Sequence, residues 1–156
     1  MIYVFDTSSF SVLNHYYPDR IPSFWRNFDE FVFQGKILSV REVFNELSGK
    51  GNKAHLEKWI KVNKRIFMLP SGQETLFVGQ IFSVRHFQQL VGEKQRLKGT
   101  PVADPFVIAS AKIRKACVVT EEDKKPNAAK IPNVCEHFGI DCTNLEGFME
   151  REGWSF

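Results

Sequence analysis

The sequence predicts a three-layer α/β/α fold in which helices cover both faces of a parallel sheet. Short apolar runs at residues 2–5, 36–38 and 117–119 are typical of buried strands. Between these runs lie longer segments whose apolar residues recur at helical spacing. Strands that alternate with helices form parallel β-α-β units, so we expect a central sheet of four to five short strands.

In the N-terminal half, the elements follow from apolar spacing and from turn residues. Phe24, Phe28 and Phe31 recur at i, i+4 and i+7, which predicts an amphipathic helix after Pro22. Ser39 and Glu42 fit a capping box, so the next helix is expected to begin at Ser39. The predicted elements are helices at 24–33, 39–48 and 53–63 and a short strand at 66–68.

In the C-terminal half, an apolar face that includes Phe77 and Ile81 predicts one long helix over 73–91. Asp104 and Pro105 match the N-cap and first position of a helix. The body of that helix is apolar almost all round, so we expect it to be covered on most sides. The remaining elements are a short helix near 133–138, a last strand at 140–142 and a last helix at 144–151.

Length, composition and cysteine content indicate a single domain of a cytoplasmic protein. The 156 residues fit a single domain, 1–156, and 43% hydrophobic residues with 25% charged residues exclude a disordered chain. We expect no membrane association, since no apolar run could span a bilayer and the N-terminus has no basic leader. Three cysteines without a Cys-x-x-Cys pair predict reduced, mostly buried thiols. A net charge of +3 excludes a histone-like binder but permits a basic patch.

Acidic residues fall where a parallel sheet gathers its ligands, at the carboxyl ends of strands. Asp6 directly follows the strand at 2–5, and an acidic run at 121–123 follows the strand at 117–119. Glu46, on the 39–48 helix, and Asp104 can reach the same edge.

Each of these acids also has a structural interpretation. Asp6 and Asp104 could be helix N-caps, and Glu46 could be a solvated surface acid. Glu42 has a role in the capping box, whereas Glu46 lies one turn further along without one and borders an apolar stripe. Several carboxylates around one point repel each other unless a cation lies among them. Oxygen ligands favour Mg²⁺ or Mn²⁺, so the pattern predicts a metal site for phosphoryl chemistry.

Four motifs in order resemble the PIN domain, the nuclease fold of many bacterial and archaeal toxin–antitoxin toxins. They are Val4-Phe5-Asp6-Thr7-Ser8, Val43-Phe44-Asn45-Glu46-Leu47, Ala103-Asp104-Pro105-Phe106-Val107-Ile108-Ala109 and Val118-Val119-Thr120-Glu121-Glu122. Two further stretches, 21–25 and 130–135, are similar to an uncharacterised toxin–antitoxin-like branch of that family. The resemblance implies a PIN-like version of the predicted fold.

The resemblance also implies roles for particular residues. Asp6, Glu46 and Asp104 match the first three metal-site acids of the family. Glu122 stands where the family usually has Asp or Asn, so Glu121 and Asp123 remain open as the fourth ligand. The matching polar positions, which could support an acid or cap a helix, are Thr7, Ser8 and Thr120.

The function implied by the resemblance is a Mg²⁺- or Mn²⁺-dependent endoribonuclease that hydrolyses RNA phosphodiesters without a covalent enzyme intermediate. It would be the toxin of a type II toxin–antitoxin pair, held by a small antitoxin protein. The longer Glu122 motivates an alternative, a catalytically weak RNA-binding or protein-interaction module on a PIN scaffold. A phosphatase-like or DNA-directed metal enzyme is a third hypothesis, because metal chemistry alone does not choose the substrate.

Basic residues suggest where RNA would lie. Arg96 and Lys98 precede Asp104 closely, and Lys53 and Lys58 belong to a basic segment at 50–65. Such residues bind phosphates without reading sequence. For Lys58 the alternative is a solvated helix face.

Apolar residues suggest a partner surface. Four apolar residues lie beyond the core-facing stripes of their predicted helices: Val78, Phe82, Trp25 and Phe33. Their extra apolar surface indicates a homodimer or an antitoxin groove. The alternative is a wide core-facing stripe. Four other phenylalanines beside the acidic motifs are expected to pack in the core: Phe5, Phe44, Phe77 and Phe106.

Overall fold

The computed structural model describes residues 1–91 and 102–156. Their strands form a five-stranded sheet in the order β3-β2-β1-β4-β5, and every pair is parallel. The fold prediction of an α/β protein with a central parallel sheet is therefore confirmed. The strands are β1 (Tyr3–Phe5), β2 (Ile37–Val40), β3 (Phe67–Met68), β4 (Cys117–Val119) and β5 (Cys142–Thr143).

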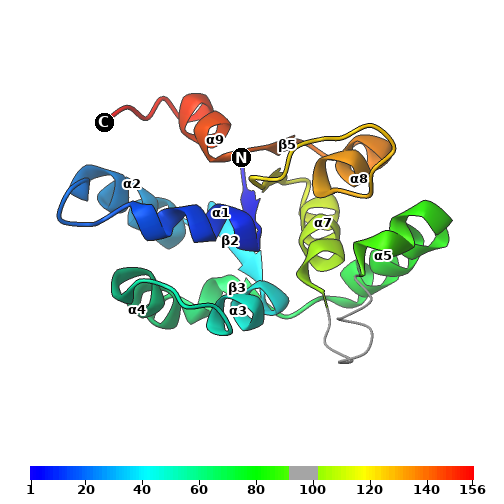
Figure 1. Ribbon diagram of the computed structural model, residues 1–156, viewed down its shortest axis with the longest axis horizontal. Helices are drawn as coiled ribbons and strands as arrows, with labels where there is room; N and C mark the ends of the chain where they lie inside the picture. Colours follow the sequence, from blue (N-terminus) through cyan, green and yellow to red (C-terminus); the bar gives the residue numbers. More distant parts are fainter. Residues whose placement is uncertain (92–101) are drawn as a thin grey trace.

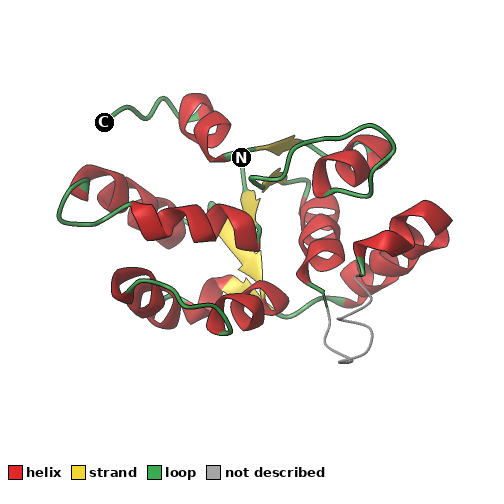
Figure 2. Cartoon of the chain, in the orientation of Figure 1, coloured by secondary structure: helices red, strands yellow, loops and turns green. Residues whose placement is uncertain are grey.

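Helices cover both faces of this sheet (Figure 1). Helices α1, α2 and α4 lie on the left of the view, while α7, α5 and α8 lie on the right, so the strands run between two groups of helices (Figure 2). Because both faces are covered, all residues of β1 and β4 are buried. The helices are α1 (Thr7–Val12), α2 (Pro22–Phe33), α3 (Arg41–Ser48), α4 (Ala54–Val62), α5 (Gly72–Ser83), α7 (Ala103–Arg114), α8 (Ile131–Phe138) and α9 (Leu145–Arg151).

Aromatic rings form much of the core under the sheet edge. The ring of Phe5 in β1 lies 5.4 Å from that of Phe10, 5.5 Å from that of Phe28 and 5.3 Å from that of Phe148, measured between centroids. Phe5 and Phe77 are buried as predicted, whereas Phe44 and Phe106 are only partly buried and pack against the core. The phenylalanine beside Asp6 is thus fixed from three elements.

The capping box predicted at Ser39 does not form. Ser39 lies in β2, where its buried hydroxyl donates to the carbonyl oxygen of Phe5 at 2.7 Å. Helix α3 begins two residues later, after Val40, without a side-chain cap. Glu42 consequently has no capping role: it is 4% exposed, and its Oε2 has no hydrogen-bond partner.

The long helix predicted over 73–91 is also interrupted. Helix α5 ends at Ser83, Val84 is extended (φ −82°, ψ 106°), and a 3-10 helix, η3 (Arg85–Leu90), follows. The turn at Val84 directs Phe87 and Leu90 into the core, where both are buried.

Cys117 and Cys135 are buried, Cys142 is partly buried, and all three thiols are free, as predicted. Among the described helices, none combines the length and apolar character needed to cross a membrane.

Candidate active site

Parallel pairing brings the residues after β1 and β4 together. Phe5 pairs with Val119, so Asp6 and Thr120 leave neighbouring strands at the same level. The backbone N–H of Asp6 extends this pairing by donating to the carbonyl of Val119 at 3.1 Å. The two side chains predicted at separate strand ends therefore meet.

Both carboxylate oxygens of Asp6 are held by hydrogen bonds. Thr120 Oγ1 donates to Oδ2 at 2.5 Å, and the backbone N–H of Ser9 donates to Oδ1 at 2.8 Å. Ser8 Oγ lies 2.8 Å from each oxygen. Asp6 is 3% exposed, and burial raises its pKa despite the opposing effect of these bonds. Asp6 also caps α1, so its capping and site interpretations coexist.

Ser8 and Thr120 connect Asp6 to the loop after β4. Their hydroxyl oxygens lie 3.3 Å apart. The backbone N–H of Glu121 donates to Ser8 Oγ at 2.9 Å, and that of Glu122 donates to Thr120 Oγ1 at 3.1 Å. The two hydroxyls therefore set the position of the acidic loop relative to Asp6.

Glu46 is held between two other helices. Thr7 Oγ1 in α1 donates to its Oε1 at 2.8 Å, and the backbone N–H of Ala103 donates to its Oε2 at 2.9 Å. Glu46 is partly buried, so it is no freely solvated surface acid. Its contacts join α3 to the first residues of α1 and α7.

Asp104 is not the N-cap of its helix, contrary to the sequence prediction. Helix α7 begins at Ala103, and the N-cap residue Val102 makes no side-chain bond. The carboxylate of Glu46 accepts the hydrogen bond at this helix start instead. The side chain of Asp104 in the first helical turn is thus available for another role.

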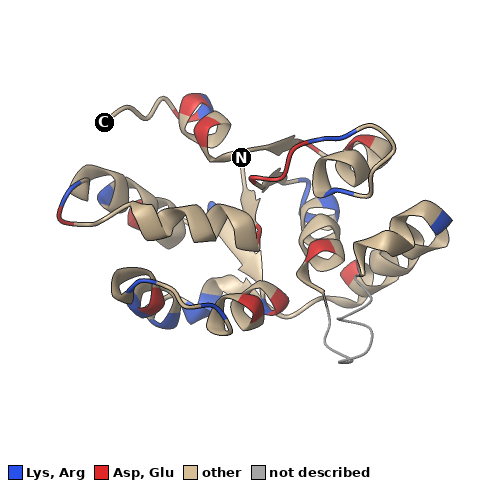
Figure 3. Ribbon diagram, viewed as in Figure 1, with Lys and Arg blue, Asp and Glu red and all other residues tan. Residues whose placement is uncertain are grey.

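The pKa of Asp104 shows that the four predicted acids share one electrostatic environment. Burial, which is the largest cause, and the negative charges of Glu122, Asp6 and Glu46 together raise this pKa to about 8. Lys130 opposes the shift. Sequence reasoning missed Lys130, which lies at the start of α8 and has no motif signal. Figure 3 shows acidic positions on α3, α7 and the loop after β4 around this edge of the sheet.

The three acids after Thr120 have different surroundings. Glu122 Oε2 accepts from the backbone N–H of Ile131 at 2.9 Å, and its charge acts on Asp104. Glu121 Oε1 accepts from the N–H of Leu145 at the start of α9, at 2.8 Å. Asp123 is exposed. Glu122 is therefore the best-placed candidate for the fourth acid, and Glu121 secures α9.

The donor set fits a hard divalent cation by its chemistry. It consists of carboxylates, and a cation would offset the repulsion felt by Asp104. As the side chains are placed in residues 1–91 and 102–156, no three His, Cys, Asp or Glu are grouped closely enough to hold a metal ion. The bonds of Glu46 and Glu122 to the starts of α7 and α8 account for this separation.

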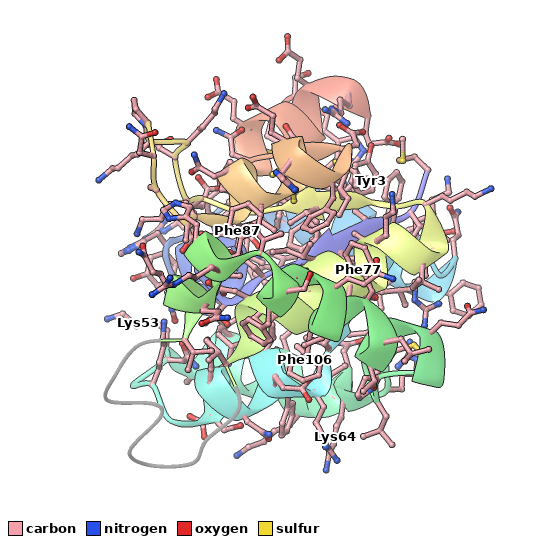
Figure 4. The ribbon with its side chains drawn as sticks, turned by 90° about the vertical axis from the view of Figure 1, so that its right-hand side faces the viewer. Tyr3, Lys53, Lys64, Phe77, Phe87 and Phe106 are labelled. Carbon is pink, nitrogen blue, oxygen red and sulfur yellow. The ribbon has the colours of Figure 1, made fainter. Side chains whose placement is uncertain are left out.

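The predicted RNA contacts are placed only in part. Arg96 and Lys98 lie outside the described residues. Lys53 is exposed and lies at the left of the view in Figure 4, whereas Lys64 lies at the lower edge. Lys58 is exposed on α4, where Figure 3 shows several basic positions.

The prediction of surplus exposed apolar surface is largely wrong. Trp25 and Val78 are buried, at 6% and 8% exposed, because α2 and α5 present wide faces to the core. Phe82 is partly buried against the same core. Phe33 alone among the four is fully exposed, at 81%.

Comparisons with known proteins support the fold. A family model described as "Domain of unknown function (DUF4411)" matches residues 3–156. Among solved structures, a similar chain comes from the crystal structure of VapBC2 from Rickettsia felis bound to a DNA fragment from their promoter. That match has a TM-score of 0.52 and 18% identity, and it covers 93% of this chain and 99% of the other. No curated protein matches the sequence.

Proposed function

This chain belongs to DUF4411, a family described as a domain of unknown function, and from its site we propose that it is a divalent-metal-dependent endoribonuclease. The observation that carries the proposal is the set of buried or partly buried carboxylates that hydrogen bonds hold at one edge of the sheet, where the negative charges of Asp6, Glu46 and Glu122 act on Asp104. The same four acids match the PIN motifs, and the similarity to a VapBC2 chain supports a PIN-like fold.

Mg²⁺ or Mn²⁺ would be held by Asp6, Glu46, Asp104 and Glu122. When bound, such an ion lowers the pKa of water and stabilises the leaving oxygen of a phosphodiester. The protein's contribution is orientation: Ser8 and Thr120 hold Asp6, while Thr7 holds Glu46. These hydroxyls fix the acids before substrate arrives, which reduces the ordering that the reaction itself requires.

The biological context we propose is that of a cytoplasmic toxin. The PIN-like motifs of this chain resemble those of toxin–antitoxin toxins, and the similar VapBC2 structure is bound to a DNA fragment from their promoter. By analogy, this chain would act on RNA and be restrained by a small antitoxin protein, and we propose that it also forms a homodimer. Expression of the chain should slow growth, and co-expression of a small open reading frame adjoining its gene should restore growth.

Cleavage of RNA by the purified protein tests the activity. Asp104→Asn removes one candidate ligand while keeping the side-chain size, and we expect it to reduce cleavage with Mn²⁺ by more than about 100-fold. Asp123→Asn is the matched control, because Asp123 is acidic, close in sequence to Glu122 and exposed. Equal cleavage by the wild type and Asp104→Asn would show that the proposed site is wrong. Single-stranded DNA in parallel reactions tests the DNA-directed hypothesis.

The separation of the carboxylates favours one alternative, an RNA-binding or protein-interaction module with weak catalysis. Glu122 is bonded to the start of α8 and is one methylene longer than the Asp expected there. Calorimetric titration with Mn²⁺ distinguishes the two functions. Absence of metal binding together with retained RNA binding would favour the module.

A further inference from the structure

A pocket of about 490 Å³ lies beside the candidate active site, between η3, the loop after β4 and α8. No sequence motif predicts it, because its residues come from three separate segments. Phe87 forms part of its wall and is labelled in Figure 4. The polar or charged residues that line it are His86, Lys124, Asn127, Asn133, Glu136 and His137.

The pocket is rich in hydrogen-bond donors. Two imidazoles, one ammonium group and two amides line it, and its single acid, Glu136, forms an ion pair with Lys124. No net negative charge on the lining therefore opposes a bound phosphate. Uncharged or cationic donors around a cavity of this kind suit an anionic, polar ligand.

The aromatic wall is held in place. The ring of His137 lies edge-on to Phe87 at 5.1 Å and to Phe138 at 4.7 Å, between centroids. His86 lies 5.9 Å from the ring of Phe87. Both histidines are exposed, whereas Phe87 is buried. The buried ring of Phe87 therefore supports the two imidazoles at the pocket surface.

The loop wall is also fixed, and it connects the pocket to the acids. Asn133 Nδ2 donates to the carbonyl of Lys125 at 2.7 Å, and its Oδ1 accepts from the N–H of Lys125 at 3.3 Å. Lys124 and Glu136 line both this pocket and an adjoining hollow of about 510 Å³ that includes Thr120 and Glu122. A chain that occupies the pocket can therefore continue toward the acidic site.

We propose that this pocket binds one unstacked nucleotide of single-stranded RNA next to the phosphodiester to be cleaved. The base lies against His86 and His137, and Lys124 contacts a phosphate. Histidine rings stack on splayed bases of single-stranded RNA, whereas paired bases remain inside the duplex. The inference rests on the proposed nuclease function and deepens it by assigning a nucleotide subsite to this pocket.

Binding of short RNA to the metal-free Asp104→Asn protein tests the proposal by fluorescence anisotropy. The probes are a labelled single-stranded 12-mer and its duplex. His86→Ala/His137→Ala should weaken binding of the single strand by about tenfold, the effect expected from losing one stacking contact. Binding of the duplex should be unchanged. His15→Ala is the matched control, because His15 is exposed and lies outside the pocket in the 3-10 helix Leu13–His15.

The outcomes separate this proposal from the nuclease proposal. Unchanged single-strand affinity in the double variant overturns the pocket assignment, even if wild-type protein still cleaves RNA in an Asp104-dependent manner. If the double variant unfolds, Lys124→Ala against Lys125→Ala decides instead, with weaker single-strand binding expected only for Lys124→Ala. Wild-type protein that neither binds nor cleaves single-stranded RNA overturns the nuclease proposal, and the pocket proposal with it.

Discussion

Among the individual residues, Asp104 lies in an electrostatic environment that disfavours its negative charge. Its pKa is raised to about 8 by burial and by three neighbouring acids. An ordinary aspartate in the unfolded chain titrates near 4. The folded protein therefore holds a proton on Asp104 over the pH range in which the unfolded chain has released it, and folding is disfavoured increasingly as the pH rises through that range.

Asp104→Asn should consequently stabilise the protein while abolishing activity. The stabilisation is expected to be near zero below pH 4, to grow as the pH rises toward 8 and then to level off. At about 1.4 kcal/mol per pKa unit, the difference between the two pKa values sets an upper bound of about 5–6 kcal/mol on the gain in the free energy of unfolding at this plateau. Urea denaturation of both proteins from pH 4 to pH 9 measures this difference. A difference that is independent of pH would contradict the assigned environment of Asp104.

A second prediction for a single residue concerns Glu42 and the stability of the fold. Its side chain is 4% exposed, and Oε2 has no hydrogen-bond partner. Because burying an unpaired polar atom costs free energy, Glu42→Met should raise the free energy of unfolding by about 1 kcal/mol. Glu150→Gln, on the exposed face of α9, is the control that removes a charge without burial. Loss of stability in Glu42→Met would show that this carboxylate has an unseen favourable role.

The sequence predicts the positions of some site residues correctly and the roles of others wrongly. The physical reason differs from residue to residue. Asp6 and Thr120 follow apolar strands directly, so strand pattern alone places them at the sheet edge. Asp104 is predicted as an N-cap because local patterns cannot include the distant Glu46, which accepts a hydrogen bond from Ala103 at the helix start, 57 positions away. Ser39 and Glu42 have the spacing of a capping box, but Ser39 belongs to the strand and bonds Phe5.

Between elements, the site depends on helix ends that meet around Glu46. Helix α1 contributes Thr7, and α7 contributes the N–H of Ala103. Helix α1 is six residues long, too short for apolar periodicity to predict it, so only the family resemblance points to Thr7 and Ser8. The break at Val84 is similarly hidden, since the apolar spacing of 73–91 continues across it.

Thr7→Val tests the link between α1 and α3. It removes the hydroxyl that holds Glu46 Oε1 and keeps the shape of the side chain. We expect RNA cleavage to fall by about 10- to 100-fold, the usual effect of losing a residue that orients a ligand. Ser11→Ala, on the same helix and bonded only to the carbonyl of Thr7, is the matched control. Similar losses in both variants would indicate a general effect on α1.

A second prediction between elements concerns Asp141 and Arg151, which join the strand β5 region to α9. Arg151 donates to both oxygens of Asp141, at 2.7 Å and 3.0 Å, and these bonds lower the pKa of Asp141. The stabilisation is present above the ordinary aspartate pKa and is lost as the pH falls through the lowered one. Since the pair is partly exposed, Arg151→Met should cost only about 0.5–1 kcal/mol at pH 7. Thermal unfolding at pH 7 and pH 2.5 measures the cost, which should shrink at the lower pH.

For the whole molecule, the sheet edge concentrates negative charge that the fold must accommodate. The net charge of +3 conceals this edge, because basic residues lie on other elements such as α4. Hydroxyl groups and the backbone N–H groups at two helix starts donate hydrogen bonds to these carboxylates and hold them in place. A bound divalent cation would relieve the repulsion and add its binding free energy to the stability of the folded state.

Metal addition and removal should therefore shift the global unfolding of the wild type. At a Mn²⁺ concentration 100 times its dissociation constant, linkage gives about 2.7 kcal/mol of added stability, which EDTA should reverse. The increase in unfolding temperature should be larger at pH 8.5 than at pH 6, because at the lower pH the cation must displace the proton from Asp104. Asp104→Asn should show a smaller shift with little pH dependence. Equal shifts in the two proteins at both pH values would place any bound Mn²⁺ elsewhere on the molecule.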